Sequence, residues 1–294
     1  MDVLKRLFEE HFHAPVERLQ PLQGQLGGSA RKIIRLAGGT LSAIGILYGV
    51  REENVAFLEF SRHFRRHGLP VPEIYGEDLS HGAYLEEDLG DTTLFEFLSK
   101  NRSGKNIASQ AIETYREVVA VLPRFQIEAA RDLNYKLCYP RASFDRQSIA
   151  WDLNYFKYYF LRLAGIPFNE QALEDDFVRL TKFLLSASRD YFLYRDFQSR
   201  NIMLRDSRPF SVDYQGGRKG ALQYDIASLL YDAKAGGQNH RLHLPRFSNP
   251  RCRTTTSTPL VLRKCFANSS ARYTDRCCPP VQPNDTIRLL KPRC

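Results

Sequence analysis

The sequence predicts an α+β protein of two lobes, a small β-rich front lobe and a helical body. Short β-prone runs joined by glycine turns dominate residues 1–90. A helical period then runs through most of residues 109–188. We therefore expect one lobe over 1–90, a second over 91–236 and a separate segment over 237–294, here called the basic tail.

The front lobe is expected to be an antiparallel sheet with flanking helices. Apolar residues from Val3 to Phe12 recur at helical spacing, and the turn Gly38-Gly39 joins two β-prone runs. Pro70 ends a second helical pattern. The expected helices cover 1–20 and 52–67, and the expected strands cover 32–36, 41–48, 74–75 and 83–86.

The body begins with a capped helix and is rich in aromatic residues. Asp91-Thr92-Thr93 is a typical N-cap sequence and predicts a helix over Leu94 to Lys100. Further along, the stretch from Trp151 to Leu161 carries six aromatic side chains in eleven residues. Such a segment is typical of a helix in a packed body.

The positive charge of the chain belongs to the basic tail. The tail holds nine Arg and two Lys against two Asp, and therefore carries the whole formal net charge of +9. The two lobes together are neutral, so the charge does not favour nucleic acid as a partner of the folded part.

The basic tail has an unusual composition. It contains seven of the fifteen prolines, five of the six cysteines and no Glu, which is typical of disorder or of an out-of-frame translation. The cysteines form no CxxC pair, so a cysteine zinc site is not expected. The chain shows no apolar run long enough for a membrane span and no signal-peptide pattern, so we expect no membrane association, a cytoplasmic location and no obligate protein partner.

One segment of the body carries residues suited to phosphoryl transfer. Asp196 stands five residues before Asn201, which is the spacing of the kinase catalytic loop, although Tyr194 takes the place of the usual histidine. Asp213 follows an apolar strand seventeen residues after Asp196, where kinases place a second magnesium ligand. Asp and Asn also form ordinary turns, but apolar strands bracket both elements here.

These motifs resemble the aminoglycoside phosphotransferase and choline kinase superfamily, which has the protein-kinase-like fold. Within it the chain is similar to bacterial cell-wall kinases of N-acetylmuramate and N-acetylglucosamine. The resemblance runs from about 20 to 235. The matching stretches are 28–35, 53–57, 68–73, 85–91, 194–204, 212–215 and 224–233.

The resemblance implies a role for each matched residue. Asp196 would be the catalytic base, Asn201 and Asp213 would bind Mg²⁺, and Asp225 would brace the catalytic loop. ATP would bind between the glycine-rich loop and a hinge whose backbone faces the adenine. The implied nucleotide-binding residues are Gly27, Gly28, Ser29, Arg31, Glu53, Glu87 and Asp88.

The chain departs from the kinase pattern in two places. The strand over 41–48 lacks the phosphate-binding lysine, so Glu53 lacks its usual partner, and Arg31, Lys32 or Arg35 could take that place. The amino-sugar kinases share this absence. The helical body also runs into the basic tail where the superfamily has further helices, so we expect a truncated second lobe.

The acceptor site is predicted from an aromatic and acidic stretch. Asp145, Trp151 and Asp152 suit a sugar ring, by stacking and by hydrogen bonds to its hydroxyl groups. The alternative is an amphipathic helix that packs Trp151, Phe156 and Phe160 into the lobe.

We therefore expect an ATP- and Mg²⁺-dependent kinase that phosphorylates a hydroxyl of a small molecule, in particular a sugar or amino sugar. Two alternatives stay open on the same residues. One is a catalytically impaired, nucleotide-binding regulatory domain, because the lysine is missing. The other is an aminoglycoside-type antibiotic kinase. A nucleic-acid binder acting through the basic tail is a further possibility that the neutral lobes do not favour.

Overall fold

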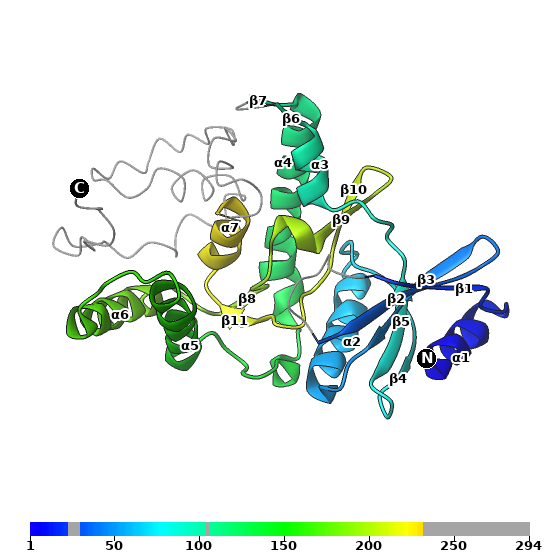
Figure 1. The fold of residues 1–294 in the computed structure, drawn as a ribbon, viewed down its shortest axis with the longest axis horizontal. Coiled ribbons are helices and arrows are strands. Elements are labelled where there is room, and N and C mark those ends of the chain that lie inside the picture. The colour runs from blue at the N-terminus through cyan, green and yellow to red at the C-terminus, as the bar shows by residue number, and fades with distance from the viewer. Residues whose placement is uncertain (23–29, 104–105, 232–294) are drawn as a thin grey trace.

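The computed structural model describes residues 1–22, 30–103 and 106–231 (Figure 1). The expected phosphate loop with Gly27, Gly28 and Ser29, and the basic tail, lie outside the described residues. The front lobe is a five-stranded antiparallel sheet in the order β1-β2-β3-β5-β4. Its strands are β1 (Arg18–Pro21), β2 (Lys32–Gly38), β3 (Leu41–Leu47), β4 (Ile74–Asp78) and β5 (Ala83–Glu87).

A helix covers each face of this sheet (Figure 1). Helix α1 (Asp2–Phe12) buries Leu4 and Phe8 in an apolar cluster with β2 and β5. Helix α2 (Arg51–Arg66) packs Phe57 against Tyr84 on the opposite face, with ring centroids 5.3 Å apart. Residues on β5 therefore alternate between the two faces, as the period of a strand requires.

The first helix is shorter than the sequence predicted. It ends at Phe12, and His13 takes the left-handed conformation (φ 53°). Pro15 follows two residues later, and a proline disfavours helical geometry in the residue before it. The predicted end at residue 20 was wrong because Arg18–Pro21 pairs with β2 as an edge strand.

The body begins with the predicted capped helix. Helix α3 (Leu94–Lys100) has Thr93 as its N-cap, in a capping box with Glu96. The long helix α4 (Ser109–Pro123) follows and continues through the short turns η1 (Arg124–Glu128) and η2 (Ala129–Arg131). Between α3 and α4 lie the two-residue strands β6 (Arg102–Ser103) and β7 (Asn106–Ile107), and η3 (Tyr135–Leu137) comes after η2.

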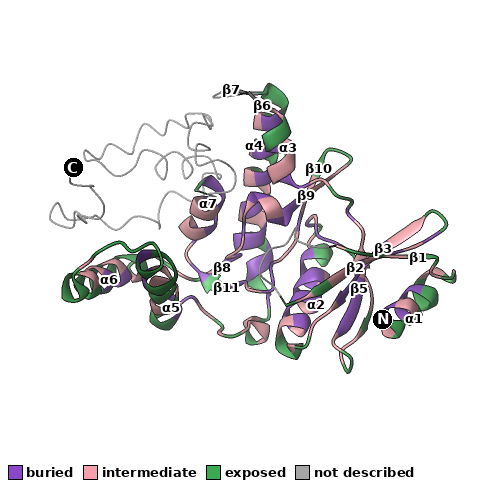
Figure 2. Ribbon diagram, in the orientation of Figure 1, coloured by how far each residue is buried: buried purple, intermediate pink, exposed green. Residues whose placement is uncertain are grey.

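Two further helices form a pair at one end of the molecule (Figure 1). They are α5 (Arg146–Phe156), extended by η4 (Lys157–Arg162), and α6 (Glu170–Leu185). Much of this pair is exposed, whereas β5 is mostly buried (Figure 2). Its exposed large apolar residues are Trp151, Tyr155, Tyr158, Tyr159, Phe160, Leu163, Val178, Phe183 and Leu184.

The remaining elements surround the catalytic motif. They are β8 (Tyr191–Leu193), η5 (Ser199–Asn201), β9 (Ile202–Arg205), β10 (Arg208–Ser211), β11 (Arg218–Gly220) and α7 (Gln223–Leu230). β8 pairs with β11 and β9 pairs with β10, both antiparallel.

One apolar cluster joins α2 of the front lobe to the body. Phe57 stacks on Tyr214, with ring centroids 5.0 Å apart, and Tyr214 contacts the hydroxyl of Ser61. The described residues contain no helix that is long and apolar enough to cross a membrane. The predicted α+β, two-lobed fold is confirmed, and its shared core holds the catalytic motif against the front lobe.

Candidate active site

The predicted catalytic loop leaves β8 directly into the core. Tyr194 is fully buried, and its hydroxyl donates a hydrogen bond to the carbonyl oxygen of Val212 at 2.6 Å. Its ring lies edge-on to those of Phe125 and Tyr214. A buried tyrosine at the histidine position therefore links the catalytic loop to the segment that carries Asp213.

Asp225 on α7 holds the start of this loop. Its carboxylate accepts hydrogen bonds from the backbone amides of Tyr194 and Arg195, each at 2.9 Å, and from the side-chain amide of Gln126 at 2.7 Å. Arg195 has a φ of 77°, a conformation that costs free energy in a residue with a side chain. The three hydrogen bonds compensate for this cost and fix the loop before Asp196.

Asp196, Asn201 and Asp213 come together in one cluster. The side-chain amide of Asn201 donates to the backbone oxygen of Asp196 at 2.8 Å and to Asp213 Oδ2 at 3.1 Å. Gln215 donates to Asp213 Oδ1 at 2.5 Å. Because both donors of the Asn201 amide group point to these partners, its Oδ1 is the atom that Asn201 offers to a cation.

The cluster is electrostatically suited to a divalent cation. Burial raises the pKa of Asp196 to about 6, and the nearby charge of Asp213 adds to the effect, while Arg195 opposes it. The Asp213 carboxylate and the Asn201 amide oxygen are hard oxygen ligands of the kind that Mg²⁺ prefers. The donor set therefore fits the magnesium ion that the sequence predicted here.

Arg31 reaches this cluster from the front lobe. Its guanidinium donates to Glu53 Oε2 on α2 at 2.7 Å and lies 3.5 Å from Asp213 Oδ1. It also stacks over the ring of Tyr48, 4.7 Å from the centroid. The side chain is 10% exposed. Arg31 is therefore the cation that pairs with Glu53, a choice that the sequence left open.

The other two candidate cations lie elsewhere. Arg35 donates to Asp88 at 2.7 and 3.0 Å and to Asp91 at 2.8 Å, and Lys32 is exposed. Alternation over residues 31–35 placed Arg31 and Arg35 on one face, but it could not show which acidic residues each of them would contact.

The predicted hinge residues have paired side chains. Glu87 forms ion pairs with Arg205 and, at 3.6 Å, with Arg65. Asp88 pairs with Arg35 and also accepts a hydrogen bond from the backbone amide of Gly90 at 3.0 Å. Protein partners therefore occupy the carboxylates of both predicted hinge residues.

Glu86, the residue before this pair, was not among the predicted site residues. It shares the face of β5 that carries Tyr84, opposite Ile44 and Ile74 on the neighbouring strands. Its Oε2 is buried and has no hydrogen-bond partner among the described residues. Burial raises the pKa of Glu86 to about 8, with Arg31 opposing and Asp213 adding to the shift. The signal available in the sequence was the place of Glu86 two residues after Tyr84, which puts both side chains on one face of the strand.

The three predicted acceptor residues separate in the structure. Asp152 lies beside the catalytic loop, where it accepts a hydrogen bond from Arg195 at 3.2 Å. Asp145 is the N-cap of α5, bonded to the amide of Ser148 and paired with Arg141. Trp151 is 45% exposed, with Arg141 near its ring. Asp145 thus has a structural partner at each oxygen, which its position before a helix could have indicated. The exposure of Trp151 and Phe160 contradicts the alternative in which both pack into the lobe.

Comparison with known families decides the relationship. The model of the phosphotransferase enzyme family matches residues 48–244, which include the hinge, the catalytic loop, Asp213 and Asp225. The chain belongs to this family.

Two curated kinases have sequences similar to this chain. An N-acetylmuramate/N-acetylglucosamine kinase of Pseudomonas aeruginosa is 24% identical over 82% of this chain and 68% of its own length. A protein of the same name in Neisseria meningitidis is 26% identical over 55% of this chain and 46% of its own length. The chain therefore spans about two thirds of one relative and under half of the other.

Solved structures show the same fold at low identity. Choline kinase LicA from Streptococcus pneumoniae gives a TM-score of 0.56 at 14% identity, covering 81% of this chain and 76% of its own. A mutant of aminoglycoside phosphotransferase APH(4)-Ia, in a ternary complex with ADP and hygromycin B, gives 0.54 at 13% identity, covering 81% and 80%. The predicted kinase-like fold is confirmed, and the family implies that the chain is a nucleotide-using kinase.

Proposed function

We propose that the protein transfers the γ-phosphoryl group of ATP to a hydroxyl of an amino sugar of the N-acetylmuramate or N-acetylglucosamine class. The observation that carries the proposal is the cluster of Asp196, Asn201 and Asp213 with Arg31 beside it. The names of the curated relatives supply the acceptor class.

Asp196 is the proposed catalytic base. An ionised Asp196 would accept a hydrogen bond from the acceptor hydroxyl, orient its oxygen toward the γ-phosphorus and take up its proton. The backbone on either side of Asp196 is fixed through Asp225 and Asn201. The chain thus supplies positioning, which is most of what phosphoryl transfer needs from a protein.

Arg31 and the pair of Asn201 and Asp213 would act on the phosphates together. Arg31 is oriented by Glu53 and presents a permanent charge at the front-lobe side. Asn201 Oδ1 and the Asp213 carboxylate would hold Mg²⁺, which supplies charge neutralisation on the phosphate oxygens when it is bound. The phosphate loop over 24–29 and the hinge over 85–89 remain proposed nucleotide contacts.

The acidic residues of the α5–α6 pair favour an amino sugar over an aminoglycoside. Polycationic aminoglycosides require unpaired acidic groups on the acceptor side. Lys157 pairs with Glu170 at 2.6 Å and with Glu174 at 2.7 Å. Arg179 pairs with Asp176. These three carboxylates have cationic partners, and Asp175 on the same helix accepts a hydrogen bond from the side-chain amide of Gln171. The described part of α6 therefore leaves few of its carboxylates without a partner for a polycation to meet.

An ADP-release assay over sugars, amino sugars, choline and aminoglycosides tests the proposal. We expect turnover with the N-acetylated amino sugars, and a loss of about 100-fold or more in kcat for Asp196→Asn with retained nucleotide binding. Asp190→Asn is the matched control, because Asp190 is exposed one residue before β8. Full activity of Asp196→Asn would contradict the catalytic role. Nucleotide binding without turnover on any acceptor would support the regulatory-domain alternative instead.

A further inference from the structure

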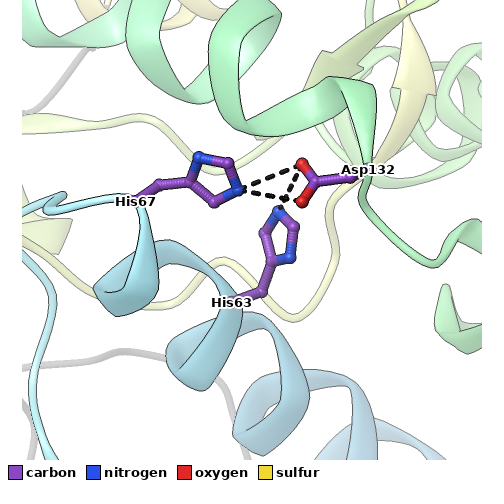
Figure 3. Close-up of side chains that lie close together, drawn as sticks. All are labelled: His63, His67 and Asp132. Carbon is purple, nitrogen blue, oxygen red and sulfur yellow. Dashed lines mark hydrogen bonds and ion pairs between the residues drawn. The ribbon is translucent and has the colours of Figure 1, made fainter.

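Two histidines and an aspartate meet on the side of α2 that faces the body (Figure 3). His63 lies in the last turn of α2, His67 is the residue that caps its C-terminal end, and Asp132 directly follows η2. Residues four apart on a helix project on the same face, so both imidazoles approach the carboxylate together. No residue of this cluster belongs to the proposed active site.

The spacing of the three groups suits one metal ion. His67 Nε2 lies 3.0 Å from Asp132 Oδ1 and 3.2 Å from Oδ2, and His63 Nε2 lies 3.7 Å from Oδ1. All three ligand atoms fall within 4.8 Å of one another. Ligand atoms around a tetrahedral zinc ion with bonds of about 2.0–2.1 Å lie about 3.3 Å apart. The distances from the two imidazole nitrogens to Asp132 Oδ1 are therefore within about 0.4 Å of that spacing.

We propose that His63, His67 and Asp132 form a binding site for a divalent transition metal of the Zn²⁺ class. Two imidazoles and one carboxylate match the ligand preference of Zn²⁺ and Co²⁺, whereas Mg²⁺ and Ca²⁺ prefer oxygen alone. His63 is buried, His67 is half-buried and Asp132 is exposed. The exposed carboxylate leaves a path from solvent and room for water as a fourth ligand.

The metal would replace hydrogen bonds that hold the cluster together. His63 Nε2 lies 2.7 Å from the carbonyl oxygen of Ala129, and His67 Nε2 contacts Asp132. Both imidazoles must present an unprotonated Nε2 to a metal, so binding gives up these two bonds. Folding has already brought the three side chains together, since the rings of His63 and His67 lie 4.7 Å apart. The ordering cost of binding is correspondingly small.

A metal at this position would connect the two lobes. Helix α2 also carries Glu53, the partner of Arg31. Asp132 follows η1 and η2, and Gln126 of η1 bonds to Asp225, which holds the catalytic loop. The ion would therefore strengthen the attachment of α2 to the segment under the catalytic loop. This inference does not depend on the nature of the acceptor.

Metal titration of the full chain tests the site. After dialysis against a chelator, Co²⁺ is titrated and its visible absorption recorded, and melting temperature is measured with and without Zn²⁺. The wild type should bind one equivalent that shows cobalt absorption without thiolate charge transfer, and Zn²⁺ should raise its melting temperature. His67→Gln and Asp132→Asn should each lower the affinity for that equivalent by at least about 10-fold.

His81→Gln is the matched control, because His81 also pairs with an aspartate, Asp78, at 2.9 Å, outside any cluster of three ligands among the described residues. It should bind Co²⁺ as the wild type does. Comparison between variants also separates this site from the cysteines of the basic tail, whose binding all the variants share. Equal stoichiometry, affinity and spectra for the wild type, His67→Gln and Asp132→Asn would overturn the proposal.

Discussion

The surroundings of the catalytic loop are buried and hydrogen-bonded, whereas the aromatic residues of the α5–α6 pair are exposed. Around the loop, Tyr194 and Asp225 are fully buried and both have hydrogen-bond partners. On the helical pair, Trp151, Tyr159 and Phe160 are about half exposed or more. Chemistry that needs fixed geometry is thus placed in the shared core. The described part of the chain leaves the aromatic face of the helical pair uncovered, and the family match extends beyond the described residues to 244.

Replacing Asp225 should cause the largest effect. Asp225→Ala removes the acceptor for the buried backbone amides of Tyr194 and Arg195, at a cost of about 1–3 kcal/mol for each amide. The free energy of unfolding in urea measures the loss, and kcat should fall with it because the loop is released. Asp190→Ala on the exposed chain before β8 is the control. A small change in stability would mean that the buried loop does not depend on Asp225, which would contradict the contrast drawn between the loop and the α5–α6 pair.

The ion pair of Arg31 with Glu53 in the front lobe comes next. Arg31→Ala should lower kcat/KM for the nucleotide by about 10- to 100-fold, the size of one or two charge-assisted hydrogen bonds. Because Glu53 acts by orienting Arg31, Glu53→Ala should cost less, and the double variant should be no worse than Arg31→Ala. Steady-state kinetics of the three variants and of Arg31→Lys form the cycle. Additive losses would contradict the orienting role of Glu53.

Glu86 differs from Tyr194 and Asp225 because its buried Oε2 has no hydrogen-bond partner among the described residues. We expect its effect in the pH dependence of the free energy of unfolding. Its pKa, near 8 in the folded protein, lies above that of an unfolded glutamate, so the folded state binds the proton more tightly. Stability should therefore fall as pH rises from about 4.5 through 8. Glu86→Gln stays neutral and should be more stable than wild type above pH 8, by about 1–3 kcal/mol, and similar near pH 5. If the free energies of unfolding of wild type and Glu86→Gln changed in parallel with pH, Glu86 would not be buried as a charge.

The smallest effect on stability is expected on the exposed helical pair. Trp151→Ala should change the free energy of unfolding by less than about 0.5 kcal/mol. Phe125→Ala in the shared core is the comparison and should cost about 3–5 kcal/mol. If Trp151 stacks on the acceptor sugar, its loss should raise the KM for the sugar and leave kcat unchanged. An unaltered KM would remove Trp151 from the predicted acceptor site.

Short-range patterns in the sequence predicted much of the fold. β-prone runs predicted β2, β3 and β5, and Thr93 predicted the start of α3. The end of α1 was missed because an edge strand competes with helix over Arg18–Pro21, and that competition depends on a distant partner strand. The roles of the site residues stay predictions, although the structure places Asp196, Asn201 and Asp213 together.

The sequence by itself determined the two-lobed class and the catalytic loop, because periodicity and short motifs depend on neighbours along the chain. Only the tertiary structure decided which of Arg31, Lys32 and Arg35 meets Glu53, because the three cations are alike in sequence and differ in the acidic residues that the fold of the front lobe brings to them. The same holds for His63, His67 and Asp132. Their meeting follows from the packing of α2 on the body, over a sequence separation that no local pattern records.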